Sequence, residues 1–311
     1  MHIAQIGTGR VGRPTAYTIM CSQLANEITV CDVKPGLAQA FAEELKHVAA
    51  SLSIDVEINA CEKDDEVSGA DIILISAGQP RIPGVNMSRR DLASQNAKIV
   101  KYVSEMTAPK NRGAKYIVIT NPVDTMAMVC KKYSKAEFVI STGTNLESLR
   151  FRSKLAETLA TPVSKVKGWV GGEHGEAAVT LWSTAKVNNL SAEEYAKSIG
   201  QNLNKTQIES YIRSVSKLII DFIGGTEYGP AASFRDIVKA IVKDTNEILS
   251  IAAPTKIEGI PEAVFVGLPR HLGKTIGPSL YSTLPENEKQ EITNAAKAIY
   301  ETFQKVIVTL E

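Results

Sequence analysis

Residues 2–12 read HIAQIGTGRVG, a short and mostly apolar run followed by three glycines spaced as GxGxxG. The run predicts a β-strand, and residues 13–24 (RPTAYTIMCSQL) have helical spacing, with a proline in the first turn where it is tolerated. Gly7 would allow the tight turn, Gly9 a close approach of backbone N–H groups to a pyrophosphate, and Gly12 close packing of helix on strand. Strand, glycine turn and helix therefore follow in the order that dinucleotide binding requires, although glycines in such a turn can also serve the turn alone.

A second apolar run, residues 27–33 (EITVCDV), reaches Asp32 about 20 residues beyond Gly12. A carboxylate at this point can accept hydrogen bonds from the adenosine ribose and repel a 2′-phosphate, so the two motifs together predict NAD rather than NADP. Lys34 lies close enough to weaken this preference. The alternative interpretation of Asp32 is a solvated carboxylate at a strand end.

Apolar runs typical of strands recur along the first half of the chain, with helical patterns between most of them. They cover residues 2–7, 27–33, 70–77, 115–120 and 137–141. This alternation predicts an α/β fold with a Rossmann-type doubly wound parallel sheet, which binds its ligands at the carboxyl ends of the strands. The polar and glycine residues that follow the runs fit this rule: Gly7, Asp32, Gly78 and Asn121.

The pattern changes near residue 145. Residues 166–175 and 177–187 predict consecutive strands that pair, and residues 191–203 predict a helix that begins with a capping box of Ser191 and Glu194. Further helical stretches lie near residues 205–222, 233–250 and 286–308. We therefore predict a dinucleotide-binding domain over residues 1–144 and a mixed α+β substrate domain over residues 145–311.

The composition is that of a globular protein. Of its 311 residues 44% are hydrophobic and 22% are charged, and the net charge of +1 gives no indication of binding to nucleic acid or to a membrane surface. No apolar run reaches the roughly 18 residues of a membrane span, so a cytoplasmic location is expected. The four cysteines lack metal-site spacing, which predicts no metal and favours reduced thiols over a disulfide: Cys21, Cys31, Cys61 and Cys130.

Four side chains together suit a small dicarboxylic 2-hydroxy acid. Arg81, Arg89 and Arg150 offer positive charge for two carboxylates and for a polarised carbonyl, and His174 offers a group that moves one proton near neutral pH. Three of them also have a simpler interpretation. Arg89 could be a solvated loop residue, Arg150 could pair with Glu147 along one helix face, and His174 could be structural.

Seven motifs in a fixed order resemble the lactate/malate dehydrogenase family over essentially the whole chain. They are GTGRVG, the strand-ending Asp32, AGQPRIPG, RRDLASQN, TNPVD, GTNLESLR and GGEHGE. They are most similar to the archaeal-type, lactate-dehydrogenase-like malate dehydrogenases of that family. The resemblance implies an oxidoreductase of the tricarboxylic acid cycle that interconverts malate and oxaloacetate with NAD. It also implies a homo-oligomer, either a dimer or a tetramer.

The resemblance assigns roles to individual residues. For catalysis it implies His174, Glu147 and Arg89; for substrate binding Arg81, Arg89, Asn121, Arg150 and Thr226; and for cofactor binding Gly7, Gly9, Arg10, Val11, Gly12, Asp32, Ala77, Gly78, Asn96, Thr120 and Asn121. The chain departs from the family in two places. Glu147 stands where aspartate is usual, and residues 83–92 form a segment two residues longer than usual, which affects the alignment of Arg89.

Three other interpretations stay open. A lactate or other 2-hydroxy-acid dehydrogenase would differ at Arg81, where the lactate enzymes usually have glutamine. An NAD- and metal-dependent glycosidase has a similar cofactor domain but needs a Cys/His metal site, for which the sequence shows no candidate. A catalytically silent NAD-binding protein would not be expected to keep the histidine and arginine set.

Overall fold

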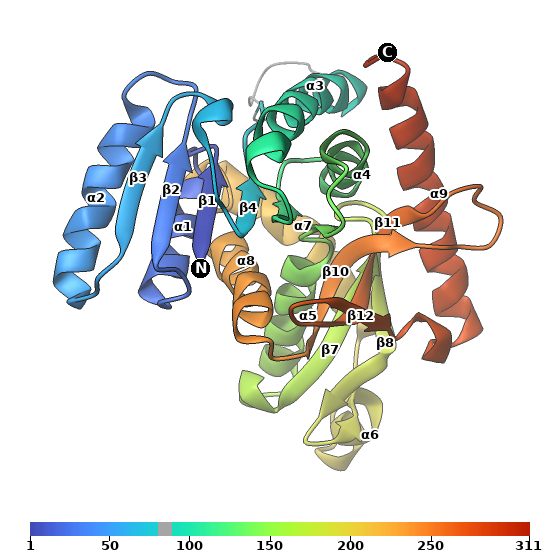
Figure 1. Cartoon of the computed structure of the whole chain (residues 1–311). Helices are drawn as coiled ribbons and strands as arrows, with labels where there is room; N and C mark the ends of the chain where they lie inside the picture. The colour runs from blue at the N-terminus through green and yellow to red at the C-terminus, as the bar shows by residue number, and fades with distance from the viewer. Residues whose placement is uncertain (80–88) are drawn as a thin grey trace.

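The first half of the chain alternates strands and helices, as its sequence predicts (Figure 1). The computed structural model describes residues 1–79 and 89–311, and the side chains of residues 1–79 and 92–311. The strands of this half are β1 (His2–Ile6), β2 (Glu27–Cys31), β3 (Glu57–Cys61), β4 (Ile72–Ile75), β5 (Lys115–Val118) and β6 (Val139–Ser141). The helices are α1 (Gly12–Cys21), α2 (Leu37–Leu52), α3 (Arg89–Thr107) and α4 (Val123–Ser134).

These six strands pair in parallel in the order β3-β2-β1-β4-β5-β6. The chain moves outward from β1 in one direction through β2 and β3, and then returns to the other side of β1 at β4. The strand order therefore reverses between β1 and β4, and doubly wound sheets bind their ligands at the carboxyl ends of the strands at such a reversal. The glycine turn after β1 lies at this end of the sheet.

Strand β4 shows why the sheet needs helices on both faces. Its residues are fully buried, and they alternate between two core clusters. Ile73 and Ile75 pack in the cluster that contains Val129 of α4, whereas Ile72 and Leu74 pack in the cluster that contains Phe234 from the second half of the chain. Burial on both faces explains why the strand reads as an uninterrupted apolar run.

The second half adds antiparallel strands and more helices to the same sheet. Its helices are α5 (Asn145–Thr158), α6 (Ala192–Ser198), α7 (Lys205–Ile223), α8 (Tyr228–Lys243) and α9 (Glu286–Ile307). Its strands are β7 (Val166–Gly172), β8 (Ala178–Val187), β9 (Leu190–Ser191), β10 (Glu247–Thr255), β11 (Val264–Leu272) and β12 (Ile276–Ser279). Ser141 of β6 pairs with Ala252 of β10, and the sheet continues in the order β10-β11-β7-β8-β9, with β12 on β11.

The predicted helix over residues 233–250 is wrong at its end. Helix α8 stops at Lys243, and Asp244 and Asn246 adopt positive φ values of 53° and 52°, which a continuing helix does not allow. The next residues enter β10, which pairs with β11 over its whole length. Pairing with a distant strand therefore overrides the local helical spacing. The predicted helix of residues 191–203 is also shorter, because α6 ends at Ser198.

Two further observations concern the sequence expectations on membranes and cysteines. Within residues 1–79 and 89–311, no helix is long and apolar enough to cross a membrane. All four cysteines are free thiols, as predicted.

Candidate active site

The glycine turn after β1 has the geometry that a pyrophosphate needs. Gly7 has φ +89°, and a methyl group built on it would lie 2.5 Å from the backbone nitrogen of Ala77 at the end of β4. A methyl group on Gly12 would collide with the carbonyl oxygen of Gly7. Gly9, in contrast, has no atom within 4 Å of such a group, so its outer face is open. The turn is therefore tight on the protein side and accessible on the ligand side.

Asp32 is held against this turn. The backbone N–H and the hydroxyl of Thr8 donate to its Oδ2 at 2.8 and 3.0 Å, and the backbone N–H of Lys34 donates to Oδ1 at 3.0 Å. Each carboxylate oxygen has two lone pairs, so Oδ1 keeps capacity for a ribose hydroxyl. The open turn and this anchored carboxylate fit NAD.

The remaining predicted cofactor residues lie together in the loops after β4 and β5 and in α3. They are Ala77, Gly78, Asn96, Thr120 and Asn121. Asn96 of α3 is buried, and its side-chain amide donates to the carbonyl of Asn121 at 2.7 Å and accepts from the N–H of Gln79 at 2.7 Å. The Thr120 hydroxyl donates to the carbonyl of Ala77 at 2.7 Å. The Asn96 amide is therefore occupied in tying the loops after β4 and β5 to each other. Gly78 fits between Thr120 and Asn96, where a methyl group would lie 2.6 Å from Cγ2 of Thr120.

The side chain of Arg10 makes its contacts away from the glycine turn. Its guanidinium reaches across to the junction of α7 and α8, where Nη1 pairs with Oε1 of Glu227 at 2.5 Å and donates to the carbonyl of Ile223 at 3.3 Å. Val11, the residue before α1, is partly buried and packs against the core beneath the turn. Sequence reasoning placed both residues at the cofactor, and gave no indication of the contact with Glu227.

His174 and Glu147 are in direct contact. Nδ1 of His174 lies 3.0 Å from Oε1 and 3.1 Å from Oε2 of Glu147, which is buried in the first turn of α5. Nη1 of Arg150, one turn further along α5, lies 3.5 Å from Oε1 of Glu147. The longer side chain of glutamate therefore reaches the imidazole. Arg150 pairs with Glu147, as its simpler interpretation predicts, and 14% of its side-chain surface stays exposed. Its role in binding a substrate carboxylate stays a prediction.

A second carboxylate, Asp124, supports His174 from the other side. Asp124 is buried in the first turn of α4, and its Oδ2 accepts the backbone N–H of His174 at 3.0 Å. Its Oδ1 accepts the hydroxyl of Ser141 at 2.7 Å, and Ser141 in turn accepts the N–H of Gly143 at 3.0 Å. Asp124 lies within the TNPVD motif, yet sequence reasoning assigned it no role. The available signal was the presence of an aspartate inside the TNPVD motif.

The charges at this site explain its protonation states. Burial acts to lower the pKa of His174, but the charge and hydrogen bond of Glu147, with a further contribution from Asp124, outweigh it and raise the pKa to about 9. Burial likewise acts to raise the pKa of Glu147, and His174 and Arg150 outweigh it and lower that pKa. The pKa of Asp124 is raised to about 6, chiefly by burial. At neutral pH the imidazole is therefore a cation between carboxylates.

Buried hydroxyls fix strand β7, which ends two residues before His174. The Thr144 and Ser250 hydroxyls both donate to the carbonyl of Val170 in β7. The N–H of Val170 donates to the Ser148 hydroxyl at 2.9 Å, and that hydroxyl donates to the carbonyl of Thr144 at 2.9 Å. The start of α5 and the end of β7 are thereby locked together, which fixes Glu147 relative to His174.

The other predicted substrate residues are described in part. Thr226 lies in the turn between α7 and α8, two residues after the left-handed Gly224 that ends α7. Arg89 is the first residue of α3, and its side chain lies outside the described residues. Arg81 lies wholly outside the described residues, so its predicted role stays a prediction.

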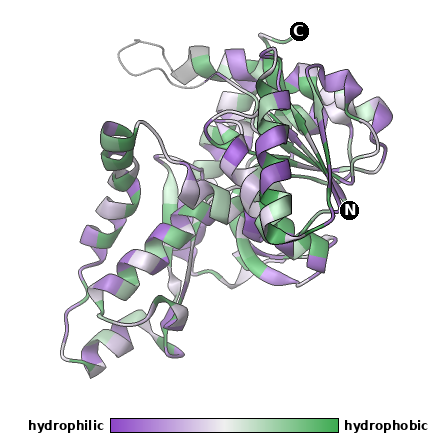
Figure 2. Ribbon diagram, turned by 90° about the vertical axis from the view of Figure 1, so that its left-hand side faces the viewer, coloured by the Kyte–Doolittle hydropathy of each residue, from purple (hydrophilic) through white to green (hydrophobic). Residues whose placement is uncertain are grey.

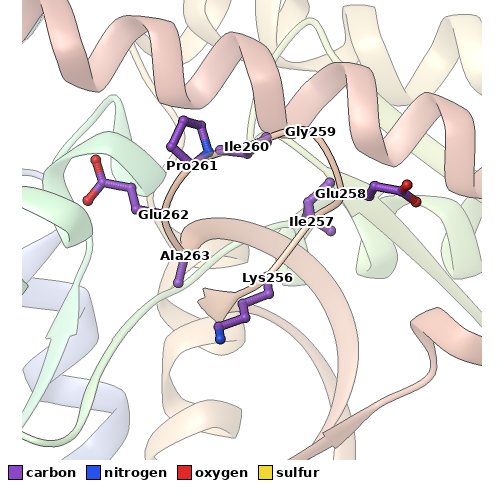
Figure 3. Close-up of a pocket in the computed structure, with 8 residues that line it drawn as sticks. All are labelled: Lys256, Ile257, Glu258, Gly259, Ile260, Pro261, Glu262 and Ala263. Atoms are coloured by element: carbon purple, nitrogen blue, oxygen red, sulfur yellow. The ribbon is translucent and has the colours of Figure 1, made fainter.

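A separate hollow lies in the loop between β10 and β11, which is lined by residues Lys256–Ala263 (Figure 3). The side chains of Glu258 and Glu262 point away from the centre of this loop in Figure 3. None of the candidate site residues lines this hollow. Among the side chains that the structure describes, no three His, Cys, Asp or Glu residues gather to hold a metal ion.

Both halves of the chain match domains of one known protein family. Residues 1–138 match the lactate/malate dehydrogenase NAD binding domain, and residues 144–308 match the lactate/malate dehydrogenase alpha/beta C-terminal domain. A malate dehydrogenase of Sulfolobus acidocaldarius is 40% identical over 309 residues, which cover 99% of this chain and 98% of that protein. An L-lactate dehydrogenase of Thermus aquaticus is 31% identical over 306 residues, which cover 96% and 97%.

A solved structure shows the same fold. The malate dehydrogenase of Salinibacter ruber superposes with a TM-score of 0.87 at 25% identity, and the match covers 99% of this chain and 98% of that one. Both halves of the chain thus match one family. The chain belongs to the lactate/malate dehydrogenase family.

Proposed function

We propose that this protein is an NAD-dependent malate dehydrogenase that interconverts malate and oxaloacetate. The observation that carries the proposal is the contact of His174 with Glu147 beside Arg150, at the end of a sheet whose glycine turn fits NAD. The malate dehydrogenase among the relatives, 40% identical over almost the full length, supports malate over lactate.

The site residues account for the proton that the reaction must move. When bound, NAD⁺ supplies the acceptor for the hydride that leaves C2 of malate. His174 in its neutral form takes the hydroxyl proton on Nε2, since its Nδ1 is bonded to Glu147. Glu147 and Asp124 stabilise the resulting imidazolium. In the reverse direction the same imidazolium returns the proton to the carbonyl oxygen of oxaloacetate.

The substrate is held by charge. Arg150 offers a planar fork for the C1 carboxylate, which all 2-hydroxy acids share, and we assign Arg81 to the second carboxylate of malate. Arg89 is proposed to polarise the carbonyl, and Asn121 and Thr226 to line the pocket. Residues 1–144 would form the dinucleotide-binding domain and residues 145–311 the substrate domain.

A four-way assay tests the proposal. NADH and NADPH are each combined with oxaloacetate and with pyruvate, and kcat/KM is measured from the loss of absorbance at 340 nm. We expect NADH with oxaloacetate to be the best pair, because Asp32 repels a 2′-phosphate and a dicarboxylate site leaves an arginine unpaired when pyruvate binds. Discrimination of about 10⁴-fold between the two substrates is typical of such a site. A preference for pyruvate would contradict the malate assignment.

Substitution of Arg81 identifies the residue responsible. Arg81→Gln should remove most of the preference for oxaloacetate while leaving or raising kcat/KM for pyruvate, since the unpaired charge is relieved. Arg90→Gln removes the same charge from the same segment and is the matched control, which should keep the preference. An Arg81→Gln variant with an unchanged preference would show that another residue selects the substrate.

We propose a homo-oligomer, a dimer or a tetramer, that works in the cytoplasm and in the tricarboxylic acid cycle. Leu218 and Phe222, near the end of α7, are 59% and 83% exposed, and exposed large apolar side chains are common at an interface between subunits. The hydropathy colouring of Figure 2 shows a hydrophobic helix end at the upper left. Light scattering coupled to gel filtration gives the assembly, and a monomeric active enzyme would contradict it.

A further inference from the structure

Arg10 joins two parts of the molecule that handle different ligands. It belongs to the glycine turn proposed to hold the pyrophosphate, and its guanidinium lies on the α7–α8 junction that carries Thr226. Its Nη1 contacts Oε1 of Glu227 at 2.5 Å and the carbonyl oxygen of Ile223 at 3.3 Å. Ile223 is the last residue of α7, and Glu227 directly precedes α8. One side chain therefore contacts both ends of the junction.

The junction is shaped to receive this side chain. Gly225 has φ +157°, and a methyl group built on it would lie 2.7 Å from Cδ and 3.1 Å from Nε of Arg10. The glycine thus provides a slot in which the arginine lies across the backbone next to Thr226. The ion pair and the slot are independent observations, and both place Arg10 at the same turn.

The end of α7 has little other support. The buried residues of α7 are Ile208 and Ile212, which lie in its first half, whereas Phe222 and Ile223 are 83% and 63% exposed. Helix α8, by contrast, packs into the core through residues such as Phe234, and Thr18 of α1 donates to the carbonyl of Ala231 at 3.4 Å. The α7–α8 turn is therefore the joint between a helix end that its own chain leaves mostly uncovered and a helix that is packed into the core.

We propose that Arg10 and Glu227 form a bridge that makes binding of the dicarboxylate depend on a filled cofactor turn. Arg10 and Glu227 are positioning residues, since they act through Thr226. Binding of the pyrophosphate by the backbone N–H groups restricts the motion of the turn that carries Arg10. Through the bridge it also restricts the motion of the turn that carries Thr226. The consequence for substrate affinity rests on the proposed malate dehydrogenase function, whereas the coupling between the two segments does not.

The variants Arg10→Ala and Glu227→Gln test the bridge together. Both should raise the KM for oxaloacetate at saturating NADH by about fivefold or more, in the usual range of coupling between sites, with kcat changed less than KM. The double variant should be no worse than the poorer single variant, because the two side chains act as one unit. Arg10→Lys keeps the charge and should restore most of the affinity. Lys217→Ala breaks the exposed pair with Asp221 on the same helix and is the matched control, with unchanged KM.

The dissociation constant of NADH separates the bridge from a simple phosphate contact. In Glu227→Gln the freed guanidinium stays near the pyrophosphate, so NADH should bind as tightly as in the wild type or more tightly while oxaloacetate binds less well. If Arg10 only contacts phosphate, Arg10→Ala weakens NADH binding and Glu227→Gln leaves the KM for oxaloacetate unchanged. That result would overturn the proposal. A variant whose kcat and melting temperature both fall while its KM for oxaloacetate is unchanged would also overturn it.

Hydrogen exchange gives a readout that needs no turnover. NADH alone should slow exchange of the amides of residues 224–228 in the wild type, whereas in Glu227→Gln the slowing should be confined to the turn around Gly9. Slowing of residues 224–228 in both proteins, or in neither, contradicts the bridge. If the wild type shows the coupled slowing but does not reduce oxaloacetate, the bridge stands and the malate assignment fails.

Discussion

His174 lies between two carboxylates that act on different parts of the residue. Glu147 contacts the ring and Asp124 the backbone N–H, so one governs the proton and the other the position of the loop. His174→Asn should keep NADH binding and lose about 10²- to 10⁴-fold in kcat, the usual contribution of a positioned proton-transfer group. Single-turnover rates with oxaloacetate measure the loss. Near-normal turnover would remove His174 from the mechanism.

The raised pKa of His174 predicts opposite pH dependences for the two directions. Reduction of oxaloacetate needs the imidazolium and should decline as the pH rises through about 9, whereas oxidation of malate needs the neutral ring and should increase over the same range. Asp124→Asn keeps the shape of the side chain and removes its charge, so it should shift both profiles to lower pH. Profiles of kcat/KM that coincide with those of the wild type would show that Asp124 acts only on the loop backbone.

The sequence predicted part of this residue set and missed another part for a physical reason. His174 was assigned from its glycine-rich motif and the chemistry of imidazole, and Glu147 from the resemblance to the family. Asp124 was missed because its function depends on Ser141 and on the backbone of residue 174, and a linear sequence does not show that these meet. The Arg10–Glu227 contact was missed for the same reason, since the two residues lie 217 positions apart.

Among the elements, helix α6 offers a test of local sequence reasoning. Its predicted capping box is confirmed, since the hydroxyl of Ser191 accepts the N–H of Glu194 at 3.2 Å and Glu194 accepts the N–H of Ser191 at 2.9 Å. Ser191→Ala should destabilise the helix by about 1 kcal/mol, so its amides should exchange about fivefold faster. Ser198→Ala, at the other end of the same helix, is the control. Equal exchange in both variants would show that packing alone holds α6.

Elements with strong local signals were predicted well, and those set by distant partners were not. The parallel strands β1, β2, β4, β5 and β6 are short apolar runs buried on both faces, and each was located from the sequence. Strand β3, with its mixed residues, was not, because it lies at the sheet edge and is only partly buried. The start of β10 was assigned to a helix, because its strand state depends on pairing with β11.

For the molecule as a whole, the charges at the site make stability depend on pH. The pKa of His174 is raised above its ordinary value of 6.5, so its contribution to stability is fully present below that value and is lost as the pH rises through about 9. The melting temperature of the ligand-free protein should therefore fall between about pH 7 and pH 10, and fall less in His174→Asn. His47→Asn changes an exposed histidine and should behave like the wild type. A wild-type melting temperature that is flat across this range would mean that Glu147 does not stabilise the cation.

The hydrogen bond from His174 to Asp124 also limits how such enzymes can be recombined. It joins residues from opposite sides of the predicted boundary near residue 144, and Ser141 supports it at the point where β6 meets β10. A chimera that takes its second half from a relative would inherit the histidine without the carboxylate that holds its loop, unless the first half supplies aspartate at position 124. The two halves are therefore not freely interchangeable modules.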